Sequence, residues 1–95
     1  MDIRQLKYFA AVAEELHFGR AARRLNISQP PLSVQVRALE HELGVRLLER
    51  TSQHVALTEA GRTVLRDAYR LIGQIEQLKV NARRASAEAR IKLRI

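Results

Sequence analysis

The chain has 95 residues, of which 46% are hydrophobic and 28% are charged, and its formal net charge is +7. This length supports one small folded domain, and the apolar content is too high for a disordered basic tail. The chain has no cysteine, which excludes disulfide bonds, Cys-ligated zinc and thiol catalysis, and no apolar run approaches the roughly 18 residues of a membrane span.

The N-terminal part predicts two helices. Apolar residues recur at spacings of three and four over residues 3–15, which indicates an amphipathic helix, and Asp2 is suited to cap it. The pattern breaks at 17–19, and a short second helix is expected over 20–26 with alanines inward and arginines outward. Residues 26–28 predict a tight turn between this helix and the next.

A third helix is expected over residues 29–43, because Pro30 and Pro31 suit a first helical turn. Gly44 suits a left-handed C-terminal cap. The two prolines lack the amides that a Ser28 hydroxyl would normally bind, so Ser28 or its neighbour stays available to an outside partner.

The third helix has an apolar face and one apolar residue on the other side. Its core side is formed by Leu32, Val36, Leu39 and Leu43. Val34 points almost directly away from that stripe, which predicts an apolar contact outside the domain. Packing of Val34 against the hairpin or a neighbouring chain remains an alternative.

From Val45 onward the apolar period changes to two, which predicts a two-stranded hairpin with its tip at residues 50–54. Thr58 is suited to cap a long helix of about 30 residues, or about 45 Å at 1.5 Å per residue. Residues 90–95 alternate between apolar and basic side chains, which predicts a strand interrupted by the end of the chain. We therefore expect this chain to be the front part of a longer protein.

One side of the long helix is apolar over more of its length than a domain of this size can cover. The stripe comprises Leu65, Ala68, Ile72, Ile75, Leu78 and Ala82. We expect a second copy of the chain to cover it, giving a homodimer. The alternative is that the stripe belongs to the core of its own subunit.

Two short helices joined by a tight turn and followed by a hairpin are typical of a winged helix-turn-helix. The predicted fold is therefore mainly α, with three helices, a two-stranded wing and a long dimerisation helix. The third helix would enter the major groove of double-stranded DNA. Gln29 can pair with adenine, Ser33 can bind several bases, and Pro30 and Val34 can pack on a thymine methyl group.

A second set of residues is predicted to contact the DNA backbone. This set comprises Ser28, Pro31, Arg20, Arg23, Arg24, Arg37, Arg50, Gln53 and His54. Between residues 19 and 37 all ionisable side chains are arginines, which suits phosphate binding. The arginines could instead form an ordinary solvated face, and Gln29 and Ser33 could serve only to cap the helix.

Catalytic and metal-binding patterns are missing from the sequence. The three histidines are scattered without metal-ligand spacing, and no nucleotide-binding loop or paired carboxylate in a pocket is evident. We expect no enzyme activity, no metal and no cofactor in this chain. The N-terminus has no export signal, so the cytoplasm is the expected location, and no membrane partner is expected.

Several motifs together resemble the N-terminal DNA-binding region of LysR-type bacterial transcriptional regulators. They are LKYF with AVAE (6–9 and 11–14), FGRAARRL (18–25), ISQPPLS (27–33), LEHELG (39–44), LLER (47–50) and LTEAG (57–61). The resemblance covers about residues 1–65. It implies a DNA-binding domain over 1–57, a linker and dimerisation helix over 58–89, and the first strand of an absent effector-binding domain over 90–95.

The resemblance also implies an inverted-repeat operator, a tetramer as a possible full-length assembly, and a small-molecule effector bound by the full-length protein. The family positions matching Gln29, Pro30, Ser33 and Val34 contact DNA, but the last is commonly arginine. A basic residue frequent at the wing tip is Gln53 here. Because of these two departures, no operator sequence is carried over from a relative.

A different class of function competes with sequence-specific binding. The basic face could belong to a helical interaction module that binds an acidic protein or coats nucleic acid without sequence preference. A sequence reader prefers its site by about 10³ or more over other duplexes, whereas such a module binds every duplex alike.

Overall fold

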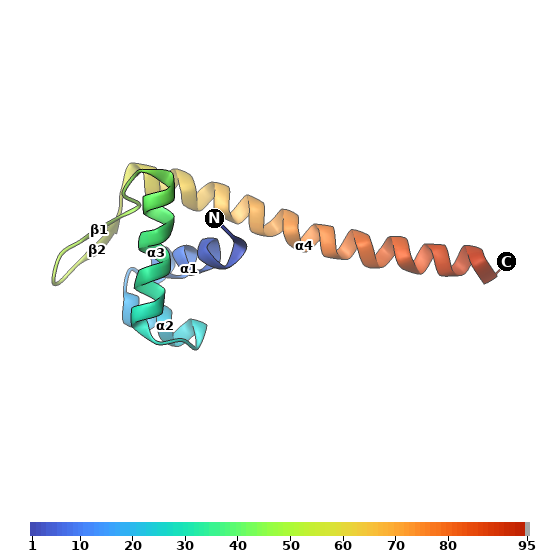
Figure 1. The fold of residues 1–95 in the computed structure, drawn as a ribbon, viewed down its shortest axis with the longest axis horizontal. Coiled ribbons are helices and arrows are strands. Elements are labelled where there is room, and N and C mark those ends of the chain that lie inside the picture. Colours follow the sequence, from blue (N-terminus) through green and yellow to red (C-terminus); the bar gives the residue numbers. More distant parts are fainter. Residues whose placement is uncertain (95) are drawn as a thin grey trace.

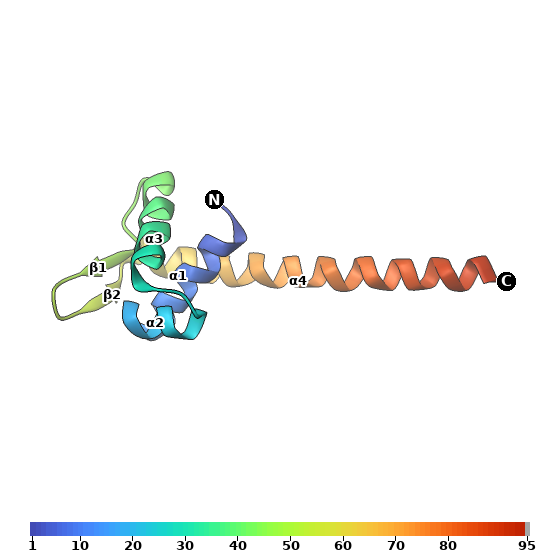
Figure 2. The same ribbon diagram turned by 60° about the horizontal axis from the view of Figure 1, so that its bottom comes forward.

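The computed structural model describes residues 1–94, and the molecule measures 65 × 26 × 19 Å. Three helices and a hairpin form a head at one end, and a single long helix extends away from it (Figure 1). Turning the molecule by 60° leaves the wing at one end and the C-terminal end of the long helix at the other (Figure 2). The predicted mainly α, winged helix-turn-helix architecture is confirmed.

The first two helices are α1 (Ile3–Glu15) and α2 (Phe18–Leu25). Asp2 caps α1 as predicted, because its carboxylate accepts a hydrogen bond from the amide of Gln5 at 2.8 Å. The expected range of 20–26 for the second helix was wrong by two residues at its start and one at its end. The cause at the start is His17, whose Nδ1 accepts from the Arg20 amide at 2.9 Å and so caps the helix earlier.

The third helix, α3, spans Gln29–Leu43, as the prolines and Gly44 predict. Ser28 precedes it in extended conformation and makes no side-chain capping bond. Gly44 adopts the left-handed region with φ of 72°, which ends the helix without steric cost. The turn between α2 and α3 begins at Asn26, which also has positive φ.

The wing consists of the antiparallel strands β1 (Leu48–Arg50) and β2 (Val55–Leu57). Leu48 pairs with Leu57, and Arg50 pairs with Val55. The tip therefore begins at Thr51 rather than at Arg50, since Arg50 belongs to the ladder. The backbone amide of Thr51 donates a hydrogen bond to the backbone carbonyl of His54 at 2.8 Å, which closes the turn.

The last helix, α4, spans Glu59–Arg94. Thr58 caps it, because its Oγ1 accepts from the amide of Gly61 at 2.9 Å. The strand expected over 90–95 is wrong for residues 90–94, which are helical, and Ile95 lies outside the described residues. Extending an existing helix costs no nucleation, and the preceding alanines and arginines are strong helix formers, so a short alternation cannot stop it.

The core lies where α1 packs against α2, α3 and α4. Its largest fully buried side chains are Phe9, Val12, Leu32, Val36, Leu39, Leu47 and Leu48. Leu32, Val36 and Leu39 confirm the predicted core side of α3, with Leu43 partly buried beside them. The amide side chain of Gln5 also bonds that of Gln35 at 3.0 Å, which ties α1 to α3. These contacts fix the opposite face of α3 toward solvent.

Over the described residues, none of the helices combines the length and the apolar character needed to cross a lipid bilayer.

Candidate nucleic-acid interface

The solvent side of α3 carries the four residues predicted to read bases. Gln29 and Pro30 are exposed at the start of the helix, and Val34 is 62% exposed one turn further on. Ser33 is half-buried on the side of α3 that faces the wing. Residues four apart lie on one strip of a helix surface, so the structure brings these side chains together on one accessible face.

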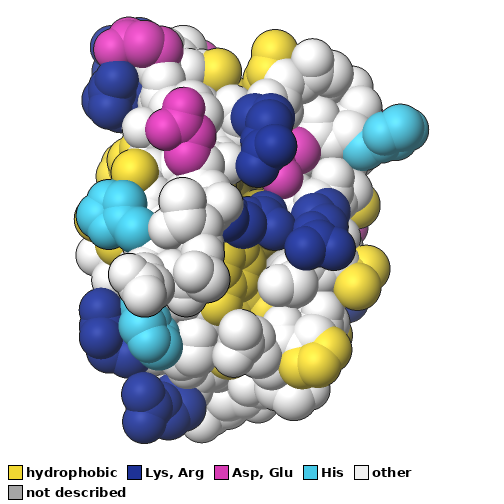
Figure 3. Space-filling view, turned by 90° about the vertical axis from the view of Figure 1, so that its left-hand side faces the viewer, with side chains coloured by type: hydrophobic (Ala, Val, Ile, Leu, Met, Phe, Trp, Pro, Cys, Tyr) yellow, Lys and Arg dark blue, Asp and Glu magenta, His cyan; other side chains and the backbone are white. Residues whose placement is uncertain are grey.

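A groove separates this face of α3 from the wing. It is lined by Leu16, His17, Phe18, Gly19, Gln29, Ser33, Arg37, Arg50, Thr51, Ser52, Gln53, His54 and Val55. Six of the residues predicted to contact DNA therefore share one opening, three from α3 and three from the wing. Seen from the end that carries the wing, Lys and Arg side chains gather around a central hollow (Figure 3).

The start of α3 presents unoccupied hydrogen-bonding capacity to solvent. Ser28 is exposed, and its hydroxyl makes no capping bond to the helix. Pro31 is exposed next to Pro30, and neither has an amide to donate. The hydroxyl of Ser28 is therefore available to an acceptor outside the chain, as the sequence predicts.

Arg50 has a structural role that the sequence did not reveal. Its Nη2 binds Glu40 Oε1 at 3.1 Å, and its guanidinium lies over the ring of Phe18 at 4.7 Å from the centroid. Burial lowers the pKa of Arg50, Glu40 opposes that shift, and the charges of Arg37 and Arg46 add to it. Arg50 thus joins the wing to α3 and α2, with its head held inside the protein surface.

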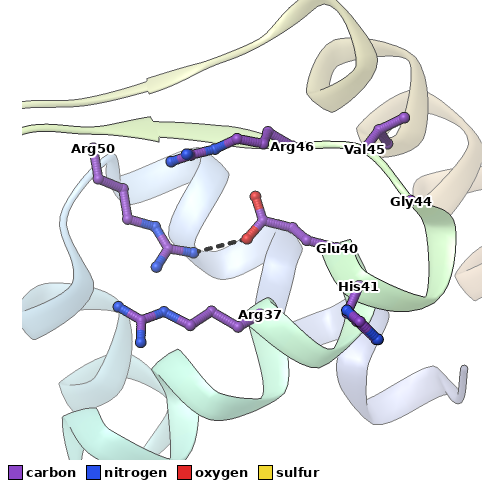
Figure 4. Close-up of a pocket in the computed structure, with 7 residues that line it drawn as sticks. All are labelled: Arg37, Glu40, His41, Gly44, Val45, Arg46 and Arg50. Carbon is purple, nitrogen blue, oxygen red and sulfur yellow. Dashed lines mark hydrogen bonds and ion pairs between the residues drawn. The ribbon is translucent and has the colours of Figure 1, made fainter.

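A second cavity lies on the other side of Arg50, and it brings in a basic residue absent from the predicted set. Arg46, in the segment before β1, lines this cavity with Arg37, Glu40 and Arg50, and of the three arginines Arg50 is the one drawn bound to Glu40 (Figure 4). One carboxylate and three arginine side chains line this cavity, so the cluster keeps an excess of positive charge next to the groove. Its position beside the predicted wing was the only sequence signal for Arg46.

The arginines of α2 differ in how far they are available. Arg24 binds Glu14, and also Glu15 at 3.2 Å. Arg20 binds the Glu15 carboxylate at 3.5 Å and its backbone carbonyl at 3.0 Å. Arg23 is exposed, and within residues 1–94 no ion pair engages it. Of the three, Arg23 is the one whose charge is not already matched by a carboxylate of α1.

The predicted apolar stripe of α4 divides into two parts. Leu65, Ala68 and Ile72 pack against the core of the head, with Ala68 only 1% exposed. Leu78 is 66% exposed, and Ala82 is exposed as well. Leu71, which was not in the predicted set, continues the exposed part toward the head. The surface free to meet a second chain is therefore the stripe of Leu71, Ile75, Leu78, Ala82 and Ala85.

In the described part of the chain, no three His, Cys, Asp or Glu side chains lie close enough together to bind a metal ion. His17 caps α2, while His41 and His54 line different cavities. The chemistry that the surface can perform is binding, through hydrogen bonds, apolar contacts and positive charge.

The sequence pattern of the bacterial regulatory helix-turn-helix proteins of the lysR family matches residues 3–62. The chain belongs to the LysR family. The match covers α1, α2, α3, the wing and the start of α4. Because this family consists of regulatory proteins, the expectation of a regulator rather than an enzyme is confirmed.

LysR-family relatives resemble the chain over most of its length. YnfL of Escherichia coli K12, described as an uncharacterized HTH-type transcriptional regulator, is 50% identical over 95 residues, which are 100% of this chain and 32% of YnfL. ClcR of Pseudomonas putida, an HTH-type transcriptional regulator, is 57% identical over 86 residues, 90% of this chain and 29% of ClcR. The chain thus spans about a third of the length of these LysR relatives.

The fold also matches a solved LysR-family structure. The crystal structure of a CbnR DBD–DNA complex superposes with a TM-score of 0.88 and is 46% identical in sequence. The superposition covers 90% of this chain and 99% of that one. The head and the first part of α4 therefore have the arrangement of a LysR DNA-binding domain.

Proposed function

We propose that this chain is the DNA-binding region of a LysR-type transcriptional regulator, which binds an inverted-repeat operator as a homodimer. The observation that carries the proposal is the groove in which Gln29, Ser33 and Arg37 of α3 face Arg50, Gln53 and His54 of the wing. The likeness to a LysR-family domain solved with DNA supports it.

The exposed face of α3 suits the major groove. An α-helix with its side chains is about 10–12 Å across, and the major groove of B-form DNA is about 12 Å wide. Gln29 and Ser33 supply hydrogen bonds to base edges, while Pro30 and Val34 supply apolar contacts to thymine methyl groups. These four residues give the sequence preference.

Positive charge on α2 and α3 supplies affinity for the phosphate backbone. Arg23 and Arg37 are exposed and carry this charge, while Gln53 and His54 at the wing tip offer hydrogen bonds to phosphate. We assign Ser28, Pro31 and Arg20 to the flanks of the same surface. Contacts of this kind fix the position of the protein on the duplex and weaken as salt rises.

A second copy of the chain covers the exposed stripe of α4 in the proposed dimer. Burial of these apolar side chains stabilises the dimer by about 25 cal/mol for each Å² of apolar surface removed from water. Residues 1–57 then form the DNA-binding unit and residues 58–89 the dimerisation helix. In the full-length cytoplasmic protein, further residues bind a small-molecule effector and allow assembly into a tetramer.

One observation favours non-specific binding as a second candidate function. Residues 82–93 of α4 carry Arg83, Arg84, Arg90 and Lys92 against the single acid Glu88, and all five side chains are exposed. Such a basic segment attracts any polyanion, whatever its sequence. Binding of DNA through this segment predicts equal affinity for all duplexes.

Selection from randomised duplex DNA tests the proposal. The purified chain is incubated with the pool at about 150 mM salt and excess competitor, and the retained DNA is sequenced. Enrichment of an inverted repeat, with half-sites about one helical turn or a multiple apart, is the expected result. A retained pool without any motif would contradict sequence reading and favour the basic segment of α4.

A further inference from the structure

One carboxylate, that of Glu14, links two helices of the head, α1 and α2, to α4. The hydroxyl of Tyr69 on α4 donates a hydrogen bond to Glu14 on α1. Arg24 on α2 binds the same carboxylate and reaches Glu15 at 3.2 Å. The two bonds lower the pKa of Glu14, and the bond to Glu14 raises the pKa of Tyr69 to about 12.

Within the described residues, Tyr69 makes the last polar contact between α4 and the head. Ala68 beside it is buried against the core, and Ile72 one turn later is only partly buried. Within residues 1–94, the polar contacts of α4 beyond Tyr69 join residues of α4 to one another. The direction in which the free part of α4 leaves the head is therefore set near Tyr69.

A small change of that direction has a large effect at the far end. Beyond Ile72, α4 continues to Arg94, about 33 Å at 1.5 Å per residue. A tilt of about 5° at Ile72 displaces the far end by about 3 Å, close to the roughly 3.4 Å rise of one base pair. A few degrees at the junction therefore correspond to a change of one base pair in the distance between two heads.

The apolar contacts of Ala68 and Ile72 hold α4 against the core, but the hydrophobic effect itself is non-directional. Hydrogen bonds are directional, and the Glu14 carboxylate receives them from two different helices. Tyr69 is 47% exposed, and an exposed polar contact contributes little to the free energy of unfolding. The arrangement suits orientation better than stabilisation.

We propose that Tyr69, Glu14 and Arg24 form a clamp that fixes the direction of α4 and thereby the distance between the two α3 helices of the dimer. Tyr69 and Glu14 act as positioning residues that need no contact with DNA. The inference rests on the proposed function for the dimer and for the DNA whose half-sites it spaces. It withdraws Arg24 from the expected contact with phosphate, since its guanidinium is engaged within the head.

A distance measurement within one chain tests the clamp without DNA. The chain has no cysteine, so Ala38→Cys on α3 and Ala87→Cys on α4 place two nitroxide labels at exposed positions. Labelled chains are diluted with unlabelled chains, and the distribution of label distances is measured by pulsed electron paramagnetic resonance. Tyr69→Phe is expected to broaden the distribution, whereas Tyr8→Phe, at the other tyrosine, is expected to leave it unchanged.

Binding to spaced half-sites tests the consequence for recognition. The selected operator is compared with versions in which one base pair is added or removed between the half-sites. Tyr69→Phe is expected to reduce the discrimination between these spacings by about threefold, with an unchanged thermal unfolding midpoint. A purely structural role would lower that midpoint and leave the spacing preference as it was.

The outcomes separate the two proposals. Equal distance distributions in the Tyr69→Phe and Tyr8→Phe chains would overturn the clamp, as would an unchanged spacing preference. A chain that selects no inverted repeat would overturn the proposed function and the role of the clamp in spacing, while the distance measurement would still decide whether Tyr69 fixes α4.

Discussion

Glu40 of α3 binds Arg50 of β1 at 3.1 Å, and its other carboxylate oxygen accepts the amides of Leu47 at 2.8 Å and Leu48 at 3.2 Å. One side chain of the candidate recognition helix therefore holds both the root of the wing and its first strand. The groove that carries the proposed function depends on this connection, because its two walls belong to α3 and the wing.

Replacing this carboxylate is expected to destabilise the head. Glu40→Ala leaves a partly buried guanidinium and two amides without their acceptor, which costs about 2–4 kcal/mol of unfolding free energy. Urea denaturation of the Glu40→Ala chain measures this loss of unfolding free energy. Glu42→Ala is the matched control on the same helix, because Glu42 is exposed and, within residues 1–94, pairs only with the terminal amino group of Met1. Equal effects of the two substitutions would contradict a special role for Glu40.

Gly61 lies where α4 crosses the root of the wing. A Cβ added there would lie 2.1 Å from the carbonyl oxygen of Leu47, so Gly61→Ala must displace backbone. A loss of about 1–3 kcal/mol is expected. Gly73→Ala on the same helix meets nothing within 4 Å and is expected to stabilise by about 0.5–1 kcal/mol. Denaturant unfolding of both variants should therefore shift in opposite directions.

Val34 tests which face of α3 reads bases. Val34→Arg is expected to change the selected base at matching positions of both half-sites and to tighten binding, because arginine can bind guanine or phosphate. Ala38→Arg adds the same charge one turn further along and is expected to leave the preferred bases unaltered. A selected motif identical to that of the unmodified chain would place Val34 outside the base-reading surface.

Arg23 tests the phosphate contacts of α2. Arg23→Ala is expected to weaken binding to all sequences alike and to reduce the slope of log affinity against log salt concentration by about 1. Arg84→Ala removes an exposed charge from the far part of α4 and should leave that slope unchanged. If Arg84→Ala lowered the slope as much as Arg23→Ala, the basic segment of α4 would be the DNA-binding surface.

Leu78 tests the dimer. Leu78 is 66% exposed, and Leu78→Asp is expected to shift sedimentation toward the monomer because it puts charge into the exposed stripe. Val80 is 43% exposed and lies about 200° around the helix from Leu78, on the other side. Val80→Asp is therefore expected to leave assembly intact. Dissociation by Val80→Asp alone would assign the interface to the opposite face.

Local signals predicted the elements that local chemistry controls. The ends of α3 follow from Pro30 and Pro31 at its start and from the positive φ of Gly44 at its end. The start of α2 was missed because its cap is His17, whereas the residues usually preferred at that position are Ser, Thr, Asp and Asn. The strand at 90–94 was wrong because alternation over a few residues carries less weight than the helix already running through Ala82 and Ala85.

The sequence predicted most of the residues that lie at the site, but not their contacts with one another. The sequence identified the exposed face of α3, since periodicity places Val34 almost directly away from the apolar stripe of that helix. It could not show that Arg24 is engaged by Glu14 and Glu15 of α1, because periodicity within one helix contains no information on its tertiary partners. Arg46 was missed for the same reason, since it joins the cluster only when the wing folds back on α3.

A crystal structure of the chain bound to its selected duplex tests the central claim most directly. The account predicts α3 in the major groove, with Gln29 and Ser33 within hydrogen-bond distance of base edges and the wing beside the backbone. A complex in which α3 does not touch base edges, and the basic part of α4 lies on the DNA instead, would contradict it.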